Sequence, residues 1–460
     1  MKNYDVVVIG GGPGGYVAAI KASQLGAKVA LVEKHKIGGV CLNYGCIPTK
    51  TYFKSAKVFK EIKDSSYYGL KIQGDVSFNW KDILLRKNQV VKKLTYGIDF
   101  LLKKNKVDLF YDFGEALTSK TIKIGNDFII NTKKLIISTG ASTFIPPIEG
   151  LKESYEKGIV KTSKELLELE DLPKKIVIIG GGVIAIEFAT IFKAFGSEII
   201  ILERQSNILN SMDQDIIKSC YKKLKNDGIE IFNNVEVMSI KDNKIFYSYN
   251  NQNQELISDT ILIATGFKSN LSGLEKLNLN IEKKSIVTDN FLRTSLPDVY
   301  AIGDVNGKYM LAHVASHEGI IAVNHALGKE ENANGINYNR IPSCVYSFPE
   351  IATIGLTEQE VKIKGIDYKI SKLPITSIGK SLADGETEGF AKLIVGKQNL
   401  DILGMHIYAY NATELISEIS VAMELEGTAH ELANAIHPHP TLSELILETY
   451  LGAIDKPIHM

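Results

Sequence analysis

The feature that most constrains this 460-residue chain is an internal repeat. Residues 5–15 read DVVVIGGGPGG and residues 175–185 read KIVIIGGGVIA, so in both copies a β-branched run ends in glycines. In both copies an acid, Glu33 or Glu203, follows the first glycine by 23 residues and ends a second apolar run. A strand, a glycine-rich turn, a helix and a second strand ending in an acid are typical of a dinucleotide-binding βαβ unit. Two copies in equal register predict two such domains in one chain.

The composition excludes several classes of protein. The 53 Lys and Arg residues balance the 53 Asp and Glu residues, so the chain lacks the positive charge that drives non-specific binding to nucleic acids. Its apolar runs are shorter than the ~18 residues of a membrane span, and its first residues lack the apolar region of a signal peptide. Four cysteines are too few for a disulfide scaffold and indicate a reducing compartment. We therefore expect a cytoplasmic protein with no membrane span and no nucleic-acid partner.

The pattern along the chain predicts an α/β fold in four parts. Two Rossmann-like domains cover residues 1–146 and 147–268, residues 269–338 return to complete the first of them, and residues 339–460 form a C-terminal α+β domain. The lysine-rich stretch 54–106 has the pattern of helices with a solvated face. Residues 110–137 indicate short strands, and residues 298–304 indicate a further strand that ends in Gly-Asp.

The glycines of each repeat have separable purposes. Gly10 allows a tight turn, Gly12 lets the backbone approach a pyrophosphate, and Gly15 lets the helix pack closely on the strand. The helix that follows directs its N-terminal N–H groups at the phosphates. The second copy carries the corresponding Gly180 and Gly182, with Ala185 at the third place, which the pattern admits.

The acids that end the second strands can bind a ribose. A carboxylate at Glu33 or Glu203 can accept hydrogen bonds from the 2′-OH. Ala185, and Arg204 directly after Glu203, leave open that the second copy binds NADP. A carboxylate would repel a 2′-phosphate, however, and Glu203 therefore favours NAD.

A cysteine pair, Cys41 and Cys46, follows the first repeat. In a regular helix, residues five apart lie about 8.6 Å apart at Cα, beyond the ~7 Å limit for a disulfide. A bridge therefore requires a distorted turn, which the neighbouring glycines and Pro48 can supply, and such a bridge suits a reducible pair. Two unrelated thiols are the alternative. The histidine and cysteine spacing elsewhere disfavours a metal site, and Cys220 and Cys344 are expected to be packing residues.

Near the C-terminus, residues 437–444 read HPHPTLSE. A carboxylate can fix the tautomer of a histidine and stabilise its imidazolium, and such a histidine can remove a thiol proton near neutral pH. A turn whose histidines only satisfy nearby backbone groups is the alternative. The residues alone leave both open.

These motifs together resemble the flavin-dependent pyridine nucleotide-disulfide oxidoreductases. The segment GGVCLNYGCIPTK is similar to the redox disulfide segment of that family, and HPHPTLSE is similar to its C-terminal signature. The two repeats, the Gly-Asp strand and the C-terminal segment occur in the family order over essentially the whole chain. We call the turn at Gly10, Gly12 and Gly15 the first cradle, and the turn at Gly180, Gly182 and Ala185 the second cradle. The resemblance implies FAD in the first cradle, NAD in the second, and a homodimer formed through the C-terminal domain.

The resemblance also implies roles for individual residues. Cys41 and Cys46 form the redox disulfide, His439 is the base, and Glu444 orients it, while His437 is structural. The cofactor-binding residues implied by the resemblance, beyond the cradle glycines and the two acids, are Lys50 with its ion-pair partner Glu187, the ribityl-binding Asp304, Gly140, Ala312 and Gly266.

Segments in the C-terminal half narrow the activity within the family. Residues 310–313 (MLAH), 348–350 (FPE) and 402–416 are similar to members that oxidise protein-bound dihydrolipoamide with NAD⁺. This implies lipoyl domains of E2 chains, or a glycine-cleavage carrier of the H type, as partners. A reductase of another low-molecular-weight disulfide is the enzymatic alternative. A redox sensor that only binds FAD is the non-catalytic one.

Overall fold

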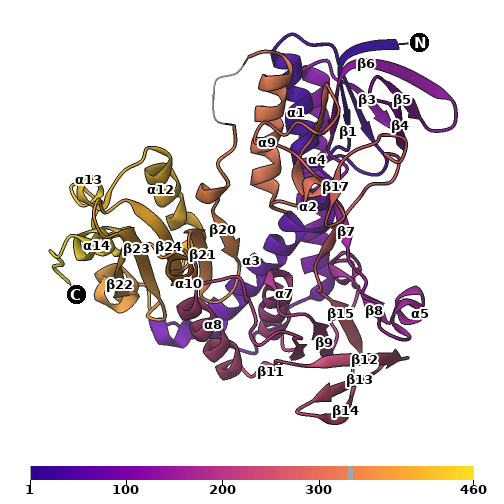
Figure 1. Cartoon of the computed structure of the whole chain (residues 1–460). Coiled ribbons are helices and arrows are strands. Elements are labelled where there is room, and N and C mark those ends of the chain that lie inside the picture. The colour runs from indigo at the N-terminus through magenta and orange to yellow at the C-terminus, as the bar shows by residue number, and fades with distance from the viewer. Residues whose placement is uncertain (1, 330–334, 460) are drawn as a thin grey trace.

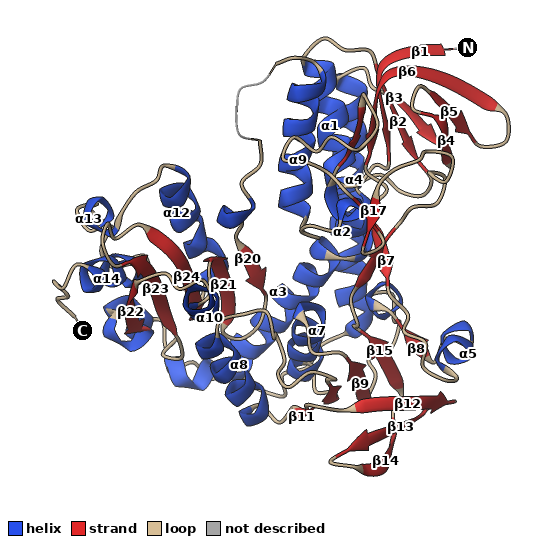
Figure 2. Ribbon diagram, in the orientation of Figure 1, coloured by secondary structure: helices blue, strands red, loops and turns tan. Residues whose placement is uncertain are grey.

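The computed structural model describes residues 2–329 and 335–459. It is an α/β fold with two Rossmann-like parallel sheets and a C-terminal antiparallel sheet (Figure 1, Figure 2). In the view of Figure 1 the N-terminal sheet lies at the top right, the second parallel sheet below it, and the C-terminal sheet at the left.

The first sheet has the strand order β3-β2-β1-β6-β5-β4, with β19 also paired to β6. Strands β1, β2, β3, β6 and β19 run parallel, and β4 and β5 add an antiparallel edge. Parallel strands are covered on both faces, which explains why β1 and β2 read as apolar runs. The strands are β1 (Lys2–Ile9), β2 (Val29–Glu33), β3 (Asp108–Tyr111), β4 (Gly114–Thr118), β5 (Thr121–Ile124), β6 (Phe128–Ile137) and β19 (Val299–Ala301).

Helix α1 (Pro13–Gln24) covers β1 and β2 and packs against α9 (Ala312–Ala326). The two helices approach closely at two glycines, because a Cβ on Gly319 would lie 2.8 Å from the carbonyl oxygen of Gly14. This contact brings α9, from the middle of the chain, beside the first glycine-rich turn (Figure 2).

The second sheet has the order β11-β10-β9-β15-β8, and all of its strands are parallel. In both sheets the first strand of the repeat lies between the second strand and a later one, so the repeat seen in the sequence is a repeat of structure. The elements are β8 (Val160–Lys161), β9 (Lys175–Ile179), α7 (Val183–Ala194), β10 (Glu198–Leu202), α8 (Gln214–Asn226), β11 (Glu230–Phe232), the antiparallel meander β12 (Glu236–Lys241), β13 (Lys244–Tyr249) and β14 (Gln252–Ile257), and β15 (Thr260–Ile263).

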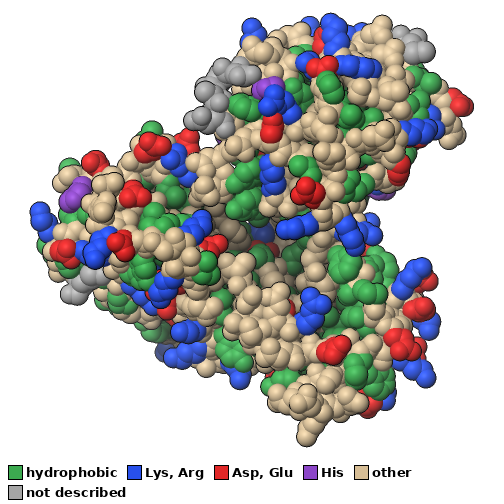
Figure 3. Space-filling view, viewed as in Figure 1, with side chains coloured by type: hydrophobic (Ala, Val, Ile, Leu, Met, Phe, Trp, Pro, Cys, Tyr) green, Lys and Arg blue, Asp and Glu red, His purple; other side chains and the backbone are tan. Residues whose placement is uncertain are grey.

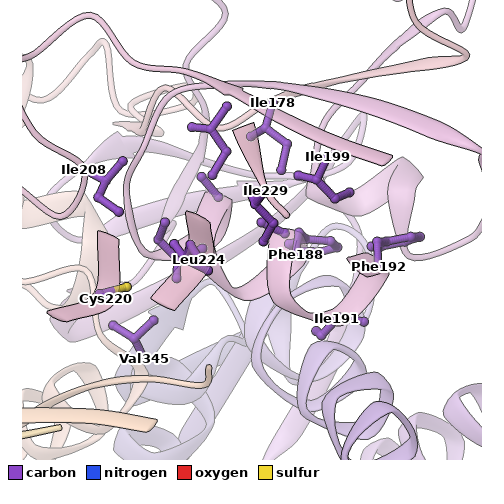
Figure 4. Packing of buried hydrophobic residues seen from close by; sticks show 14 of the residues in the cluster. Ile178, Phe188, Ile191, Phe192, Ile199, Ile208, Cys220, Leu224, Ile229 and Val345 are labelled. Carbon is purple, nitrogen blue, oxygen red and sulfur yellow. The ribbon is translucent and has the colours of Figure 1, made fainter. Parts of the chain in front are cut away.

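The core of the second sheet is built around α7, whose residues Ala185–Phe192 are all buried. Phe188 and Phe192 lie against isoleucines of the sheet in Figure 4. Cys220 of α8 is buried in the same cluster, which confirms its expected packing role. Val345 reaches this core from the C-terminal domain, and the two domains therefore share apolar packing.

The lysine-rich stretch forms helices, but not without interruption. Helix α3 (Cys46–Lys63) and helix α4 (Trp80–Lys104) are separated by residues 64–79, of which only η1 (Ser65–Tyr68) is helical. The expectation of a solvated lysine face is wrong at Lys87. This side chain is 1% exposed, because it lies on the buried face of α4. Its Nζ lies 2.6 Å from Oε1 of Glu168, which compensates the charge of the buried lysine.

The C-terminal sheet has the order β20-β21-β24-β23-β22 and is antiparallel throughout. Helix α12 packs against β21 and β24, and helix α14 packs against β22 and β23. The elements are η3 (Tyr338–Arg340), β20 (Ser343–Val345), β21 (Glu350–Gly355), α10 (Glu358–Ile363), β22 (Tyr368–Pro374), η4 (Ile375–Ser377), α11 (Gly379–Ala383), β23 (Phe390–Gly396), β24 (Ile402–Ala409), α12 (Ala412–Glu424), α13 (Ala429–Leu432) and α14 (Glu444–Ala453).

Short elements join these parts. They are α2 (Gly39–Tyr44), β7 (Ala141–Thr143), α5 (Leu151–Glu156), α6 (Ser163–Leu166), β16 (Phe267–Ser269), β17 (Ile281–Glu282), β18 (Ser285–Ile286) and η2 (Gly303–Asn306). Strands β7 and β16 pair where the chain passes between the two parallel sheets. Among the described residues, no helix is long and apolar enough to cross a membrane.

Candidate active site

Cys41 and Cys46 form a disulfide at a break between two helices. Helix α2 ends at Tyr44, α3 begins at Cys46, and Gly45 between them has φ −140° and ψ −106°. The break brings the two Cα atoms to 4.7 Å, where a regular helix would hold them about 8.6 Å apart. The distorted turn that the sequence requires for a bridge is therefore present, and a glycine supplies it.

The disulfide borders a cavity of about 420 Å³, within the range of small-molecule sites. Figure 3 shows a hollow between the domains where basic side chains gather at the edge. The cavity is lined from both repeats and from the segments between them. Lining residues include Gly10, Gly12, Glu33, Cys41, Cys46, Lys50, Gly140, Val183, Glu187, Asp304, Ala312 and Cys344.

The first glycine cradle leaves no room for side chains at two of its three positions. Gly10 has φ +101°, and a Cβ there would lie 2.1 Å from the carbonyl oxygen of Ser138. A Cβ on Gly15 would lie 1.8 Å from the carbonyl oxygen of Gly10. At Gly12 the nearest atom would be 3.9 Å away, so this position is open for a ligand to approach the backbone. A side chain would therefore clash at Gly10 and Gly15, whereas Gly12 leaves room beside the backbone.

The second cradle repeats this geometry with one difference. Gly180 has φ +109°, and a Cβ there would lie 2.4 Å from the carbonyl oxygen of Ala264. The space around Gly182 is open, because no atom of the described residues would lie within 4 Å of a Cβ at this position. Ala185 is fully buried at the third place. Gly266, with φ +99°, forms the turn before β16 and does not line the cavity.

The two acids occupy equivalent positions. Glu33 accepts hydrogen bonds from the N–H groups of Gly11 and His35, both at 2.7 Å. Glu203 accepts hydrogen bonds from the N–H groups of Gly181 and Gln205, both at 2.5 Å. Each carboxylate is thus held at the rim of its own glycine turn, where a ribose of a dinucleotide would lie.

Lys50 and Glu187 form an ion pair between the first two domains. The Lys50 Nζ atom lies 2.9 Å from both carboxylate oxygens of Glu187, whose side chain is 5% exposed. The N–H group of Tyr346 donates to the same carboxylate at 3.1 Å, and Lys50 Nζ lies 4.6 Å from the centre of the Tyr346 ring. The pair is therefore fixed by α3, α7 and the start of the C-terminal domain. Tyr346 contributes both its backbone N–H and its ring, and neither contact leaves a pattern in the sequence.

Asp304 faces the cavity from η2. Burial raises the pKa of its carboxyl to about 6, and hydrogen bonding within its own turn lowers it only in part. Gly140 and Ala312 line the same cavity, which places these three predicted residues together.

His439 and Glu444 form a hydrogen-bonded pair at the start of α14. The His439 Nδ1 atom lies 2.9 Å from Glu444 Oε1, and the N–H of Thr441 donates to Glu444 Oε2 at 3.0 Å. Partial burial raises the pKa of Glu444, but these hydrogen bonds outweigh it and leave the pKa below its usual value. The His439 side chain is 77% exposed.

His437 lies in different surroundings. Its side chain is 7% exposed, its Nε2 atom lies 3.1 Å from Glu418 Oε1, and its Nδ1 atom lies 3.1 Å from the carbonyl oxygen of Ala435. Both ring nitrogens are used in holding the turn. The surroundings fit a structural role.

The single chain does not bring the histidine to the disulfide. Helices α13 and α14 lie at the outer side of the C-terminal sheet in Figure 1, whereas α2 lies beside the first parallel sheet. His439 is absent from the lining of the cavity that contains Cys41 and Cys46.

The residues present fit two dinucleotides. Each cradle combines a glycine turn that a Cβ would fill, an open N-terminal helix end and a fixed acid, and the first opens into the cavity of the disulfide.

Comparison with known proteins gives the same assignment for nearly the whole chain. Residues 4–319 match the model of the pyridine nucleotide-disulphide oxidoreductases, and residues 341–450 match the dimerisation domain of that family, which implies a homodimer. The chain is 40% identical to the dihydrolipoyl dehydrogenase of Bacillus subtilis and 38% identical to that of Mycoplasma pneumoniae. These alignments cover 99% and 98% of this chain, and 99% of each relative.

Among solved structures, the chain is similar to the HOCl-induced flavoprotein disulfide reductase RclA from Escherichia coli, with a TM-score of 0.87 and 28% identity over 98% of this chain and 99% of that one. LpdA from Mycobacterium tuberculosis, at 24% identity and a TM-score of 0.88, has the same fold over 98% of this chain and 99% of that one. The full-length relatives are the more similar proteins in sequence. From the disulfide, the paired cradles and these matches, we conclude that the chain belongs to the pyridine nucleotide-disulphide oxidoreductase family, as one of its dihydrolipoyl dehydrogenases.

Proposed function

We propose that this enzyme oxidises protein-bound dihydrolipoamide to lipoamide with NAD⁺ as the acceptor, as the E3 component of a 2-oxo acid dehydrogenase or glycine cleavage system. The observation that carries the proposal is the Cys41–Cys46 disulfide at the wall of a cavity that α7 of the second cradle also lines. A lipoyl domain of an E2 chain, or a glycine-cleavage carrier of the H type, is the partner that would deliver the dithiol.

The first cradle holds FAD in this proposal. Gly10, Gly12 and Gly15 surround the pyrophosphate, and Glu33 binds a ribose. Asp304 binds the ribityl chain, and Lys50 with Glu187, Gly140 and Ala312 border the flavin. When bound, FAD would supply the two-electron chemistry that links the reduced cysteines to NAD⁺.

The second cradle holds NAD. Gly180 and Gly182 admit its pyrophosphate, Glu203 binds the ribose 2′-OH, and Gly266 borders the site after β15. A 2′-phosphate at this place would meet the negative charge of Glu203, which favours NAD over NADP.

His439 acts as the base towards the dithiol. Its Nδ1 atom faces Glu444, so the Nε2 atom is the one that can take a thiol proton. The resulting thiolate attacks Cys41 Sγ, the Cys41–Cys46 bond breaks, and Cys46 leaves as a thiolate. The second thiol of the substrate then attacks the substrate sulfur of the mixed disulfide and gives its proton to the leaving Cys41 Sγ, which releases lipoamide and Cys41 as a thiol. Two thiols of the substrate are oxidised and one protein disulfide is reduced.

We further propose that His439 serves the disulfide of the partner subunit. His439 is exposed and belongs to the segment between α13 and α14, two helices on the outer side of the C-terminal sheet. These observations support the arrangement, since a two-fold axis can bring such a surface to the partner's cavity. The cytoplasm is the compartment we propose. The domains we propose are residues 1–146 with 269–338 for FAD, 147–268 for NAD, and 339–460 for the dimer.

The proposal is tested by steady-state formation of NADH from dihydrolipoamide and NAD⁺, with wild type and Cys41→Ser. We expect turnover by the wild type and its loss in the variant, while NADH oxidation by a quinone survives because it bypasses the thiols. A fully active Cys41→Ser enzyme would contradict the assigned chemistry. Lipoamide, glutathione disulfide and coenzyme A disulfide in competition, with NADH as donor, would show whether another disulfide is preferred.

A further inference from the structure

A carboxylate outside the assigned site lies buried beside the flavin-binding turn. Glu318, in the middle of α9, is 0% exposed. Its Oε2 atom accepts hydrogen bonds from the N–H of Gly303 at 2.5 Å and from Asn306 Nδ2 at 3.0 Å. Its Oε1 atom accepts one from the hydroxyl of Tyr338 at 2.5 Å and lies 3.1 Å from Asn306 Nδ2.

A buried carboxylate is costly unless donors surround it. Burial raises the pKa of Glu318, and the hydrogen bonds from Tyr338, Gly303 and Asn306, with the charge of Lys308, lower it only in part. Most of the other buried residues of α9 are small or apolar. Packing of the helix therefore does not explain why a carboxylate is buried at position 318. Its partners indicate what it does.

The donors lie on both sides of Asp304. Gly303 precedes it and Asn306 follows it by two residues, and all three belong to the single turn η2. Gly303 has φ +70°, a conformation that glycine adopts readily, and a Cβ there would lie 3.0 Å from the Cβ of Ala315. Glu318 therefore holds the turn at its first and last residues, and Asp304, which lines the cavity, lies between them.

The third donor ties this turn to another part of the chain. Tyr338 belongs to η3, just before the dimerisation domain, and its ring stacks on that of Tyr309 with centroids 5.5 Å apart. Tyr309 lies in the loop between η2 and α9. One carboxylate thus connects the turn, the loop after it and the segment that leads into the last domain.

We propose that Glu318 is a positioning residue for FAD, which holds the Gly303–Asn306 turn so that the Asp304 carboxylate is set in place before the ribityl chain arrives. This inference rests on the proposed FAD site and adds a residue to it. A preset turn lowers the ordering cost of binding, so Glu318 contributes to FAD affinity through Asp304.

A double-mutant cycle measures this coupling. Apoprotein is prepared from wild type, Glu318→Gln, Asp304→Asn and the double variant, and FAD is titrated while its fluorescence is followed. We expect Glu318→Gln to raise the dissociation constant about tenfold in the wild-type background, since it removes a charged acceptor of three donors. In the Asp304→Asn background we expect a rise of about twofold or less, because the group that Glu318 positions is already impaired.

Two further variants keep the test decisive. Glu448→Gln is the matched control, because Glu448 is 4% exposed and also accepts hydrogen bonds from two backbone N–H groups and a side chain, here from Ile458 and His459. Its FAD affinity should stay within about twofold of wild type. If Glu318→Gln does not fold, Tyr338→Phe takes its place in the cycle, since it removes one donor and leaves the bonds to η2.

The outcomes separate the two proposals. Wild-type protein that binds no FAD would contradict the proposed function itself. Wild type that binds FAD, with equal rises for Glu318→Gln in both backgrounds or no rise at all, would overturn the positioning role. A rise confined to the background with Asp304 intact supports it.

Discussion

At the scale of single residues, two histidines two positions apart have opposite surroundings. The His437 side chain is 7% exposed and uses both ring nitrogens, towards Glu418 of α12 and the carbonyl oxygen of Ala435. The His439 side chain is exposed and uses one ring nitrogen, towards Glu444. A base needs a nitrogen that a substrate can reach. Of the two histidines, only His439 has a ring nitrogen that is free to serve as a base.

We expect His439→Ala to slow dihydrolipoamide oxidation by about 10²–10⁴-fold, the range that a positioned base contributes. A free thiol has a pKa of about 8.5, so little thiolate forms at pH 7 without a base. His437→Ala is the matched control, and its turnover should remain close to wild type. The kcat/KM values with dihydrolipoamide check this, and the reverse order of the two variants would show that the histidines are assigned the wrong way round.

Glu444, the carboxylate of the His439–Glu444 pair, contributes less to the rate of dihydrolipoamide oxidation than His439 does. Glu444→Gln should reduce turnover less than His439→Ala, because the amide still accepts a hydrogen bond but no longer stabilises an imidazolium. Because the pKa of Glu444 is lowered in the folded protein, its stabilising effect is complete above its usual pKa of 4.5 and is lost as pH falls through the lowered value. The advantage of wild type over Glu444→Gln in Tm should therefore persist down to pH 5. An advantage that disappears between pH 7 and pH 6 would contradict this.

The residue scale also shows what sequence can and cannot predict. Cys41, Cys46, Glu33 and Glu203 were predictable because each belongs to a local pattern of fixed spacing. Glu318 was not, because its donors come from separate segments and a single acid in an apolar helix carries no sign of them.

At the scale of elements, the two cradles are the same construction used twice. Their strand orders agree, and each acid accepts hydrogen bonds from the N–H groups of the second glycine and of the residue two positions after the acid. Equal spacing in the sequence predicted this correspondence. Two features of the helical stretch 54–106 were less predictable, namely its interruption at residues 64–79 and the burial of Lys87. Both depend on packing against distant segments.

The repeat gives a matched pair of variants for cofactor choice. Glu203→Ala should relax the preference for NADH towards NADPH, because it removes the charge that a 2′-phosphate would meet. Glu33→Ala, at the equivalent place in the first cradle, should weaken FAD binding and leave the NADH/NADPH ratio of kcat/KM unchanged. Wild-type enzyme that already turns over NADPH faster than NADH would refute the role assigned to Glu203.

At the scale of the whole molecule, a buried ion cluster joins the second parallel sheet to the C-terminal domain. Lys392 of β23 is 2% exposed, and its Nζ lies 2.9 Å from Asp213, 3.0 Å from Asp215 and 2.7 Å from Glu358. Asp213 caps α8 and also accepts from the N–H of Glu358. Lys392, Glu358 and the neighbouring Asp213 and Asp215 come from three distant parts of the sequence, so only the tertiary fold reveals the cluster.

Removing the cation should destabilise the protein strongly at neutral pH. Lys392→Met leaves carboxylates without their buried partner, which costs about 3–5 kcal/mol in comparable sites. Lys87→Met is the control with a buried lysine, and it should cost less because the side chain of its partner Glu168 is 49% exposed. The Tm at pH 7 checks the order of the two variants.

The pH dependence of that loss has a definite sign. Lys362 and Lys392 lower the pKa of Glu358 to about 2, so in wild type this carboxylate stabilises the fold above pH 4.5 and progressively less towards pH 2. Without Lys392 the carboxylates gain by protonation, and the Tm difference between wild type and Lys392→Met should shrink from pH 7 to pH 4. A difference that stays constant over this range would show that the charge of Lys392 is not the cause.

The central claim is that each active site combines the disulfide of one chain with the His439–Glu444 pair of its partner. Mixed dimers of Cys41→Ser and His439→Ala chains measure it most directly, since each heterodimer would hold one site with both cysteines and a histidine. Random mixing should restore about a quarter of the wild-type dihydrolipoamide oxidation from two nearly inactive parents. Activity that stays at the mean of the two parents would contradict the account.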